Sequence, residues 1–388
     1  MATTDLKIIG RGHEPVGELE KAMYLKHACP PSFGDDNPDP LPADVRLRRD
    51  LADTQDIDVP GGDDVRMWII RDPDDNENGR VFPSKTIRVP QNAIVHAEVS
   101  VGQSGHTIHW HGIEPSPVND GVGHTSFDVS GDFTYQFQPR SAGTFIYHCH
   151  KNTVLHFERG MYGLLIVDPP DPSNPTVFTT YRDGGPGYAA RFNPLALSAT
   201  EHVVRYDVEA FWVVDDIDSR WRDLGHEEAM QDCDRDDPVN PENFTRDGIL
   251  NDFRPDIFVL TGVARRRNDP TPFTLTNSPA LVVPQVGVGQ TLLIRAENAS
   301  YTTTEFTLGI DAEVIAMDGY ALGLPPFQRY SRPFRQPAGT PYRLTSAMRW
   351  DLLVRPALAG TYPATIKFFH SVTGRLLYTA TTSITVVE

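Results

Sequence analysis

Residues 143–150 read GTFIYHCH, a run rich in β-branched and aromatic residues that ends in two histidines flanking a cysteine. Such residues favour extended structure, and the glycine before them marks a turn, so the sequence predicts a β-strand here. Successive side chains of a strand point to opposite faces. His148 and His150 should therefore share one face, and Cys149 should point to the other.

A second histidine motif lies upstream, where residues 106–112 read HTIHWHG. By the same alternation, His109 and His111 share a face. If this strand neighbours the one that carries HCH, four imidazoles meet on one side of the sheet while the thiol faces the domain interior. The pattern therefore predicts two separate metal sites on opposite sides of one strand.

Partners for the Cys149 thiol follow it along the chain. His156 and Met161 lie in the stretch KNTVLHFERGM, which can fold back over a metal, and His106 opens the other histidine motif. Two imidazoles, one thiolate and a weak axial thioether are the ligand set of a blue copper electron-transfer site. These four residues are the predicted ligands on the interior side.

Short β-rich runs separated by turn residues surround both motifs. RMWIIR, KTIRV, AIVHAEVSV, FTYQFQP and MYGLLIVDP predict a Greek-key β-sandwich over residues 63–170. Residues 1–62 are predicted to be a loop-rich N-terminal extension, since PPSFGDDNPDPLPA is dense in proline and acidic residues. Within it, GELEKAMYLKHA is a short helical candidate.

A second β-rich set occupies residues 199–388, after a linker at 171–198, and predicts a second sandwich. AGTYPATIK, from Ala359, aligns with AGTFIYHCH, from Ala142, and AENASYTTTEFTLGI aligns with AEVSVGQSGHTIHWHGI. The second half therefore resembles a copy of the first in which other residues occupy every candidate ligand position: Thr303, Phe306, Leu308, Thr365, Ile366 and Lys367.

An acidic stretch, residues 215–248, interrupts the second half. Its length and charge predict a solvated surface excursion, and Asp215, Asp216 and Asp218 are assigned to it rather than to a site for a cationic substrate.

The composition excludes some classes of partner. A formal charge of −17 repels phosphates, so no nucleic acid is expected. No stretch approaches the roughly 20 apolar residues of a membrane span, and the visible N-terminus, MATTDLKIIGRGHEP, has no apolar signal core, which predicts a cytoplasmic protein. With Cys149 used as a ligand, Cys29 and Cys233 are candidates for a disulfide.

HTIHWHG followed by HCH, a histidine and a methionine resembles the copper-binding signature of the multicopper oxidases, the laccase-like family built from cupredoxin domains. The resemblance covers residues 65–170 closely and implies two cupredoxin-like domains, the second free of ligands. It implies that the type 1 copper ligands are His106, Cys149, His156 and Met161. It further implies that His109 binds a type 2 copper and that a type 3 pair is bound by His111, His148 and His150.

The resemblance also implies the reaction, a copper-dependent oxidation. A small-molecule or metal-ion donor would give single electrons to the type 1 copper, and the HCH tripeptide would conduct them to a second copper centre with O2 as acceptor. Cys149, His148 and His150 are the catalytic residues in this interpretation. Members of the family are commonly exported, which is the alternative localisation.

An oxygen-reducing site of this family takes eight histidines, four from each of two domains, and this chain supplies four. One hypothesis is an oxidase whose missing ligands come from another polypeptide or a homo-oligomer. Another is a single further copper, held with help from a neighbour's histidine: His202, His226 or His370. A third is a blue-copper electron-transfer or copper-binding protein. Outside the two motifs and His156, the histidines are otherwise expected to be ordinary surface, core or loop residues: His13, His27, His96, His124, His202, His226 and His370.

Overall fold

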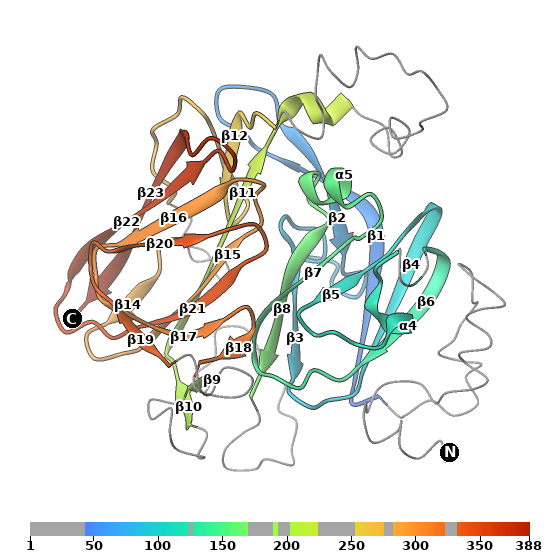
Figure 1. Cartoon of the computed structure of the whole chain (residues 1–388), viewed down its shortest axis with the longest axis horizontal. Coiled ribbons are helices and arrows are strands. Elements are labelled where there is room, and N and C mark those ends of the chain that lie inside the picture. Colours follow the sequence, from blue (N-terminus) through green and yellow to red (C-terminus); the bar gives the residue numbers. More distant parts are fainter. Residues whose placement is uncertain are drawn as a thin grey trace.

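The computed structural model describes residues 43–123, 126, 128–169, 189–192, 202–223, 253–274, 282–322 and 332–388. Strands dominate this part of the chain and form two β-sandwiches that lie side by side (Figure 1). The predicted all-β fold with two sandwiches is confirmed. No described helix is long and apolar enough to cross a membrane. The short helices are α4 (Pro117–Asp120), α5 (Thr153–Glu158) and the 3-10 turn η1 (Ser219–Asp223).

The first sandwich consists of two sheets, which we name the outer and the inner sheet of that sandwich. In the outer sheet the strand order is β2 (Val65–Arg71), β1 (Val45–Ile57), β4 (Val95–His106) and β6 (Val129–Phe137). In the inner sheet the order is β3 (Ser84–Pro90), β8 (Tyr162–Asp168), β7 (Gly143–His148) and β5 (His109–His111).

The second sandwich repeats this plan with additional strands. Its inner sheet has the order β13 (Val263–Arg266), β12 (Ile257–Leu260), β11 (Val208–Ile217), β15 (Leu292–Asn298), β21 (Arg349–Val354), β17 (Ala312–Met317) and β18 (Tyr320–Ala321), with β19 (Phe334–Gln336) paired to β17. Its outer sheet has the order β14 (Gln285–Gly287), β23 (Leu376–Val387), β22 (Gly360–Phe369), β16 (Thr303–Leu308) and β20 (Pro341–Leu344).

The strand pairings support the internal repeat inferred from sequence. β1 runs parallel to β4 as β11 runs parallel to β15, and β3 runs parallel to β8 as β14 runs parallel to β23. The antiparallel pair β5–β7 corresponds to β16–β22. The two halves therefore share one Greek-key plan, and the inner sheet of the first sandwich corresponds to the outer sheet of the second.

One of the two residue-level alignments of the repeat, that of HTIHWHG with the second half, was wrong by one position. In β16 and β22, Phe306 pairs with Ile366, and both side chains lie in the core of the second sandwich. His109 instead points away from its own core, so Phe306 cannot be its counterpart. The HCH alignment keeps the observed faces, because Ile366 lies in the core like Cys149 and Thr365 lies on the outward face like His148. Thr365 pairs across the strands with Thr307, which is therefore the counterpart of His109. A one-residue shift exchanges the faces of a strand, and sequence identity between short repeats cannot detect it.

Two predicted loop regions contain strands. Residues 45–57, assigned to the N-terminal extension, form β1, which lies between β2 and β4 and pairs with both. Its alternating apolar positions were obscured by many charged residues. Within the predicted linker, Ala189–Phe192 forms β9, which pairs with β10 (His202–Arg205). The helical candidate at 17–28, the rest of the linker, His13, His27, His124, His226, Cys29 and Cys233 lie outside the described residues.

The assignment of three acidic residues to a solvated loop was also wrong. Asp215 and Asp216 belong to β11, Asp218 follows it directly, and the three are at most 2% exposed. They are buried because β11 is covered on both faces, on one side by its own core and on the other by the first sandwich. Local charge predicted a surface position, but tertiary packing overrides that signal.

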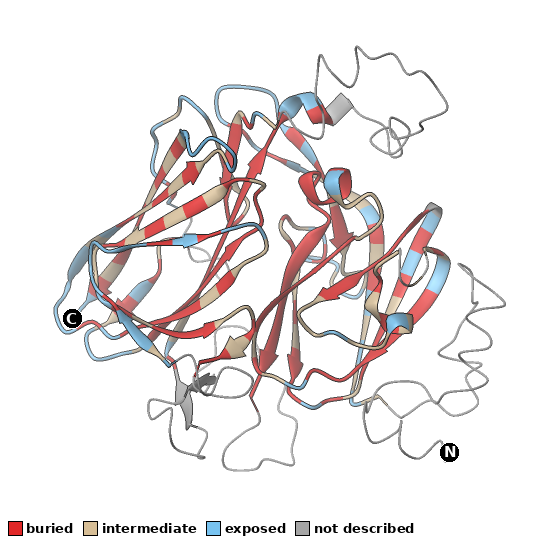
Figure 2. Cartoon of the chain, viewed as in Figure 1, coloured by how far each residue is buried: buried red, intermediate tan, exposed pale blue. Residues whose placement is uncertain are grey.

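The two inner sheets face each other, and their central strands are buried along almost their whole length (Figure 2). An apolar cluster that includes Ile146, Leu164, Ile166, Phe211 and Val213 joins them. The strands at this contact, such as β8 and β15, have no exposed position, whereas β16 and β22 in the outer sheet of the second sandwich alternate between buried and partly exposed residues. The interface between the sandwiches is thus a third hydrophobic core.

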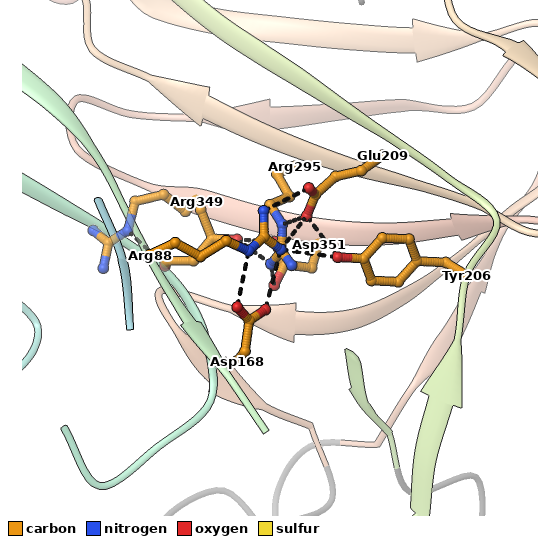
Figure 3. Close-up of polar contacts among 8 residues, drawn as sticks. Arg88, Asp168, Tyr206, Glu209, Arg295, Arg349 and Asp351 are labelled. Atoms are coloured by element: carbon orange, nitrogen blue, oxygen red, sulfur yellow. Dashed lines mark hydrogen bonds and ion pairs between the residues drawn. The ribbon is translucent and has the colours of Figure 1, made fainter. Parts of the chain in front are cut away.

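A buried ionic network closes one end of this interface (Figure 3). Arg88 on β3 binds Asp168 on β8 and reaches across to Glu209 on β11, at 2.8 Å in both cases. Arg295 on β15 donates to Glu209 at 2.6 Å and to the Thr144 hydroxyl of β7 at 2.8 Å. The guanidinium groups therefore link strands of both sandwiches through shared acceptors.

Arg295→Met should destabilise the protein by about 3–5 kcal/mol, because it leaves Glu209 and Asp351 buried with less positive charge to neutralise them. Urea unfolding of the metal-free protein measures this. Arg46→Met is the matched control: Arg46 pairs with Glu98 at 3.4 Å, but the side chains are 58% and 44% exposed, so its loss should cost no more than about 1 kcal/mol. Equal effects of the two changes would contradict a structural role for the network.

Candidate metal centre

Cys149 follows β7 directly, and its side chain points into the core of the first sandwich. The Sγ atom lies 3.2 Å from Nδ1 of His156 and 3.5 Å from Nδ1 of His106. These three ligand atoms lie within 4.8 Å of one another, and none of the three residues is more than 1% exposed. The structure therefore brings together the predicted thiolate and imidazole ligands.

This trio fits a copper ion. A first-row metal at about 2.0–2.3 Å from nitrogen and sulfur ligands separates those ligands by roughly 3.5 Å, close to the two distances found. The donor set combines one soft sulfur with two imidazoles in a water-excluding site, as in blue copper centres. Burial raises the pKa of the Cys149 thiol to about 11 in the metal-free protein, so a bound cation has to displace that proton.

The segment after Cys149 folds back over the thiol, as the sequence predicted. Asn152 adopts a left-handed conformation, with φ of 44°, immediately before α5, which carries His156. The amide of Met161 then donates to the His156 carbonyl, and the amide of Cys149 donates to the Met161 carbonyl, both at 3.0 Å. Met161 is fully buried in the same apolar cluster as Cys149.

The other histidines gather on the opposite face of β7. His109 pairs with His148 across strands β5 and β7, and these two rings and His111 have ligand nitrogens within 4.8 Å of one another. Nδ1 of His111 lies 3.4 Å from Nε2 of His148. His150 completes the cluster, with ring centroids 5.3 Å from His109 and 5.6 Å from His148. We name these four residues the histidine cluster.

Hydrogen bonds orient two rings of the histidine cluster. Nδ1 of His109 lies 2.8 Å from the carbonyl of Asp120, and Nδ1 of His148 lies 2.9 Å from the carbonyl of Cys149. A carbonyl oxygen can only accept, so each Nδ1 carries the proton and each Nε2 retains its lone pair. Such bonds fix the tautomer of metal-binding histidines. The cluster is therefore arranged with nitrogen lone pairs toward its centre.

The electrostatics of the cluster favour neutral imidazoles at two positions. Burial, helped by the nearby Arg349 guanidinium, lowers the pKa of His111 to about 3. Burial and the neighbouring His109 hold the pKa of His148 well below its ordinary value. For His109, burial acts against the protonated form, but hydrogen bonds to Asp120 outweigh it and raise the pKa. Neutral imidazole is the form that binds a metal.

The second sandwich lies beside the histidine cluster but offers it no histidine among the described residues. Tyr320 donates to the carbonyl of Gly112, next to His111, at 3.1 Å. Arg349 is 2% exposed and approaches the same glycine. Its Nη2 atom lies 3.1 Å from the point where a Cβ atom added to Gly112 would stand. Cross-strand from Arg349 lies Glu297, which is fully buried and whose carboxyl oxygens have no hydrogen-bond partner.

Sequence reasoning missed Asp120, Glu297 and Arg349, because their roles depend on contacts between segments far apart in the chain. It also missed Trp68, whose ring contacts that of His156 at 5.5 Å between centroids. Of the histidines expected to be ordinary, His96 is buried in the first sandwich and His370 lies in the turn after β22. His202 lies on β10, and its side chain is outside the described part.

A Greek-key sandwich with a buried His2Cys trio on one side of a strand and four histidines on the other defines a copper-binding cupredoxin domain. Comparison with known proteins gives the family: residues 77–172 match the model described as multicopper oxidase. That part of the chain is a multicopper oxidase domain, and members of the family bind copper.

Individual relatives agree with this assignment. L-ascorbate oxidase of Cucumis sativus is 38% identical over 97 residues, which are 23% of this chain and 16% of that protein. Copper-containing nitrite reductase of Neisseria meningitidis serogroup B is 29% identical over 160 residues, 40% of this chain and 38% of that protein. The chain thus matches well under half the length of these relatives.

Among solved structures, the blue copper oxidase from Nitrosomonas europaea superposes with a TM-score of 0.57. The superposition covers 88% of this chain and 86% of that chain, at 20% sequence identity. At this identity the likeness shows the fold alone. It extends the fold assignment across both sandwiches, beyond the residues that the family model matches.

Glu297 makes the stability of the metal-free protein depend on pH. Burial raises its pKa from 4.5 to about 8, and the Arg349 charge only partly opposes this. The folded state therefore binds the proton more tightly than the unfolded state, so this group lowers the free energy of unfolding as pH rises from about 4.5 to 8. Glu297→Leu should remove this loss of stability. Its free energy of unfolding should exceed that of the wild type by an amount on the order of a few kcal/mol at pH 8.

Urea unfolding of wild type and variant between pH 5 and pH 9 measures the effect. Glu297→Gln is the matched control, because the amide keeps the shape of the protonated acid and cannot ionise. Glu297→Gln should lose the pH dependence that Glu297 contributes, as Glu297→Leu does. At low pH, its gain in the free energy of unfolding over the wild type should be smaller than that of Glu297→Leu. A constant difference between wild type and both variants across the range would contradict a raised pKa.

Proposed function

We propose that this chain is a copper-dependent oxidoreductase of the multicopper oxidase type. A reducing substrate gives single electrons at the site formed by His106, Cys149 and His156, and the electrons pass to the histidine cluster, where O2 is the acceptor. The observation that carries this proposal is the position of Cys149 and His148, which are covalent neighbours whose side chains reach opposite faces of β7. Copper bound at the two sites would supply the one-electron redox chemistry.

The protein's own contribution is to fix the ligands and the path between them. Nδ1 of His148 lies 2.9 Å from the carbonyl of Cys149, so a hydrogen bond as well as the chain joins the two sites. The thiol side is sealed within an apolar core, which excludes water from the sulfur. Met161, buried in that core, is proposed as the weak axial ligand; His109 is assigned to type 2 copper, and His111, His148 and His150 to the type 3 pair.

The missing ligands belong to the same proposal. The counterparts of His109 and His148 in the second sandwich, Thr307 and Thr365, pair across β16 and β22 and offer no imidazole. We therefore assign completion of the cluster to a second polypeptide, either another copy of this chain or a different one. Copper content per chain, compared with the molecular mass in solution, distinguishes a complete site from a single further copper.

Cys149→Ser should abolish the intense blue absorption of the copper-loaded protein, because a hydroxyl cannot form the thiolate bond that produces it. Serine is similar in size, so the sandwich should remain folded, as circular dichroism of the metal-free variant would show. A blue band that persists in the variant would refute the ligand assignment.

Replacing His109 and His111 together by alanine should leave the blue band intact while ending oxygen consumption with a phenolic donor. The two residues face away from Cys149, so the interior site loses no ligand. Arg46→Met, on β1 of the outer sheet, is the control and should retain both properties. Oxygen uptake at the wild-type rate in the double variant would remove the histidine cluster from the reaction, and nitrite can then be tested as an acceptor in its place.

A further inference from the structure

His156 has no exposed surface. An electron donor in solution therefore cannot touch the imidazole that the proposed function assigns to electron entry. Electron transfer between non-bonded groups weakens steeply with distance, so an intervening group in contact with His156 has to reach the surface. His106 contacts the His156 ring at 4.8 Å between centroids, but it is itself only 1% exposed.

Trp68 on β2 meets both requirements. Its ring centroid lies 5.5 Å from that of His156, with the planes at 59°, and its side chain is partly exposed. The backbone amide of Trp68 donates to the carbonyl of Arg159 at 2.7 Å, which ties β2 to the segment just after α5. The indole is thus held between solvent and His156 by the same elements that position the ligand.

We propose that Trp68 is the electron-entry residue of this protein, the group that a reducing substrate contacts and through which each electron reaches His156. The inference rests on the proposed function. In each event the donor would lose one electron to a copper ion bound by His156, and any proton that the oxidised donor releases would go to water. Trp68 undergoes no net change.

Arg159 affects how easily the Trp68 indole can be oxidised. Its guanidinium carbon lies 4.5 Å above the Trp68 ring, and the group also donates to the carbonyl of Trp221 at 3.2 Å. A cation over the face of an indole attracts the electron-rich ring and opposes its oxidation. The indole therefore couples donor and acceptor electronically without becoming a discrete radical. The stacked cation also covers one face of the ring, which leaves its exposed part as the contact surface.

The test is the anaerobic reduction of the copper-loaded protein, followed as bleaching of the blue band in a stopped-flow instrument. Trp68→Leu should lower the second-order rate constant with a phenolic donor by about tenfold or more, equivalent to about 1.4 kcal/mol of activation free energy. The absorption spectrum and reduction potential should stay close to wild type, which a general disturbance of the site would not allow. Trp350→Phe, at a partly exposed tryptophan stacked on Tyr342 in the second sandwich, is the control.

A second experiment modifies the indole of Trp68 chemically. Trp110, Trp212 and Trp221 are at most 4% exposed, so the indole of Trp68 is the accessible one among the four tryptophans that remain in Trp350→Phe. Oxidation of that indole by N-bromosuccinimide should slow the bleaching while the blue band remains. Copper binding to the metal-free protein should also quench a fluorescence component that Trp68→Leu lacks.

The outcomes separate the two proposals. A wild-type protein that binds no copper or shows no blue band refutes the proposed function itself. A blue protein that is reduced equally fast with and without an intact Trp68 overturns the present inference and leaves the proposed function standing. Slower reduction with an unchanged spectrum and potential supports it.

Discussion

The alternation of side chains along β7 is the constraint on which the rest of the structure depends. His148 and Cys149 are adjacent in the chain, so their side chains must enter environments on opposite faces of one sheet. The thiol requires an apolar, water-free interior, and the imidazoles require room for several rings at one surface. A sandwich provides the first within its core. It provides the second at the outward face of its inner sheet.

That outward face cannot simply be left to solvent, because it is also strongly apolar. Ile146 on β7 and Leu164 on β8 point out of the first sandwich and are buried in the apolar cluster to which β11 and β12 of the second sandwich contribute. Thr144, at the other end of β7 from His148, is held by Arg295 and Asp351. The second sandwich therefore fixes the strand that joins the two sites, although it supplies no ligand from its described residues. This explains in physical terms why a ligand-free domain accompanies the metal-binding one.

The sequence was informative where one local pattern determines the outcome. The spacing of HWH and HCH fixed which imidazoles share a face, and the strand pairing His109 to His148 agrees with that. The fold class and the repeat were likewise readable, since turn residues and β-rich runs recur along the chain. The burial of Asp215 and Asp216 was not readable, because it depends on a sheet contributed by residues far away. The same holds for Trp68, Glu297 and Arg349, whose side chains have no local signature of their contacts.

The arrangement of sheets explains why the chain cannot complete the histidine cluster by itself. The cluster lies on the inner sheet of the first sandwich, whose counterpart in the repeat is the outer sheet of the second (Figure 1). That outer sheet is separated from the cluster by the whole thickness of the second sandwich, and Thr307 and Thr365 on it remain partly exposed. Even histidines at these positions would face away from His109 and His148. Ligands from the equivalent face can reach the cluster only from another molecule, so the incomplete set of histidines is a consequence of how the two sandwiches stack, and not only of which residues the second half carries.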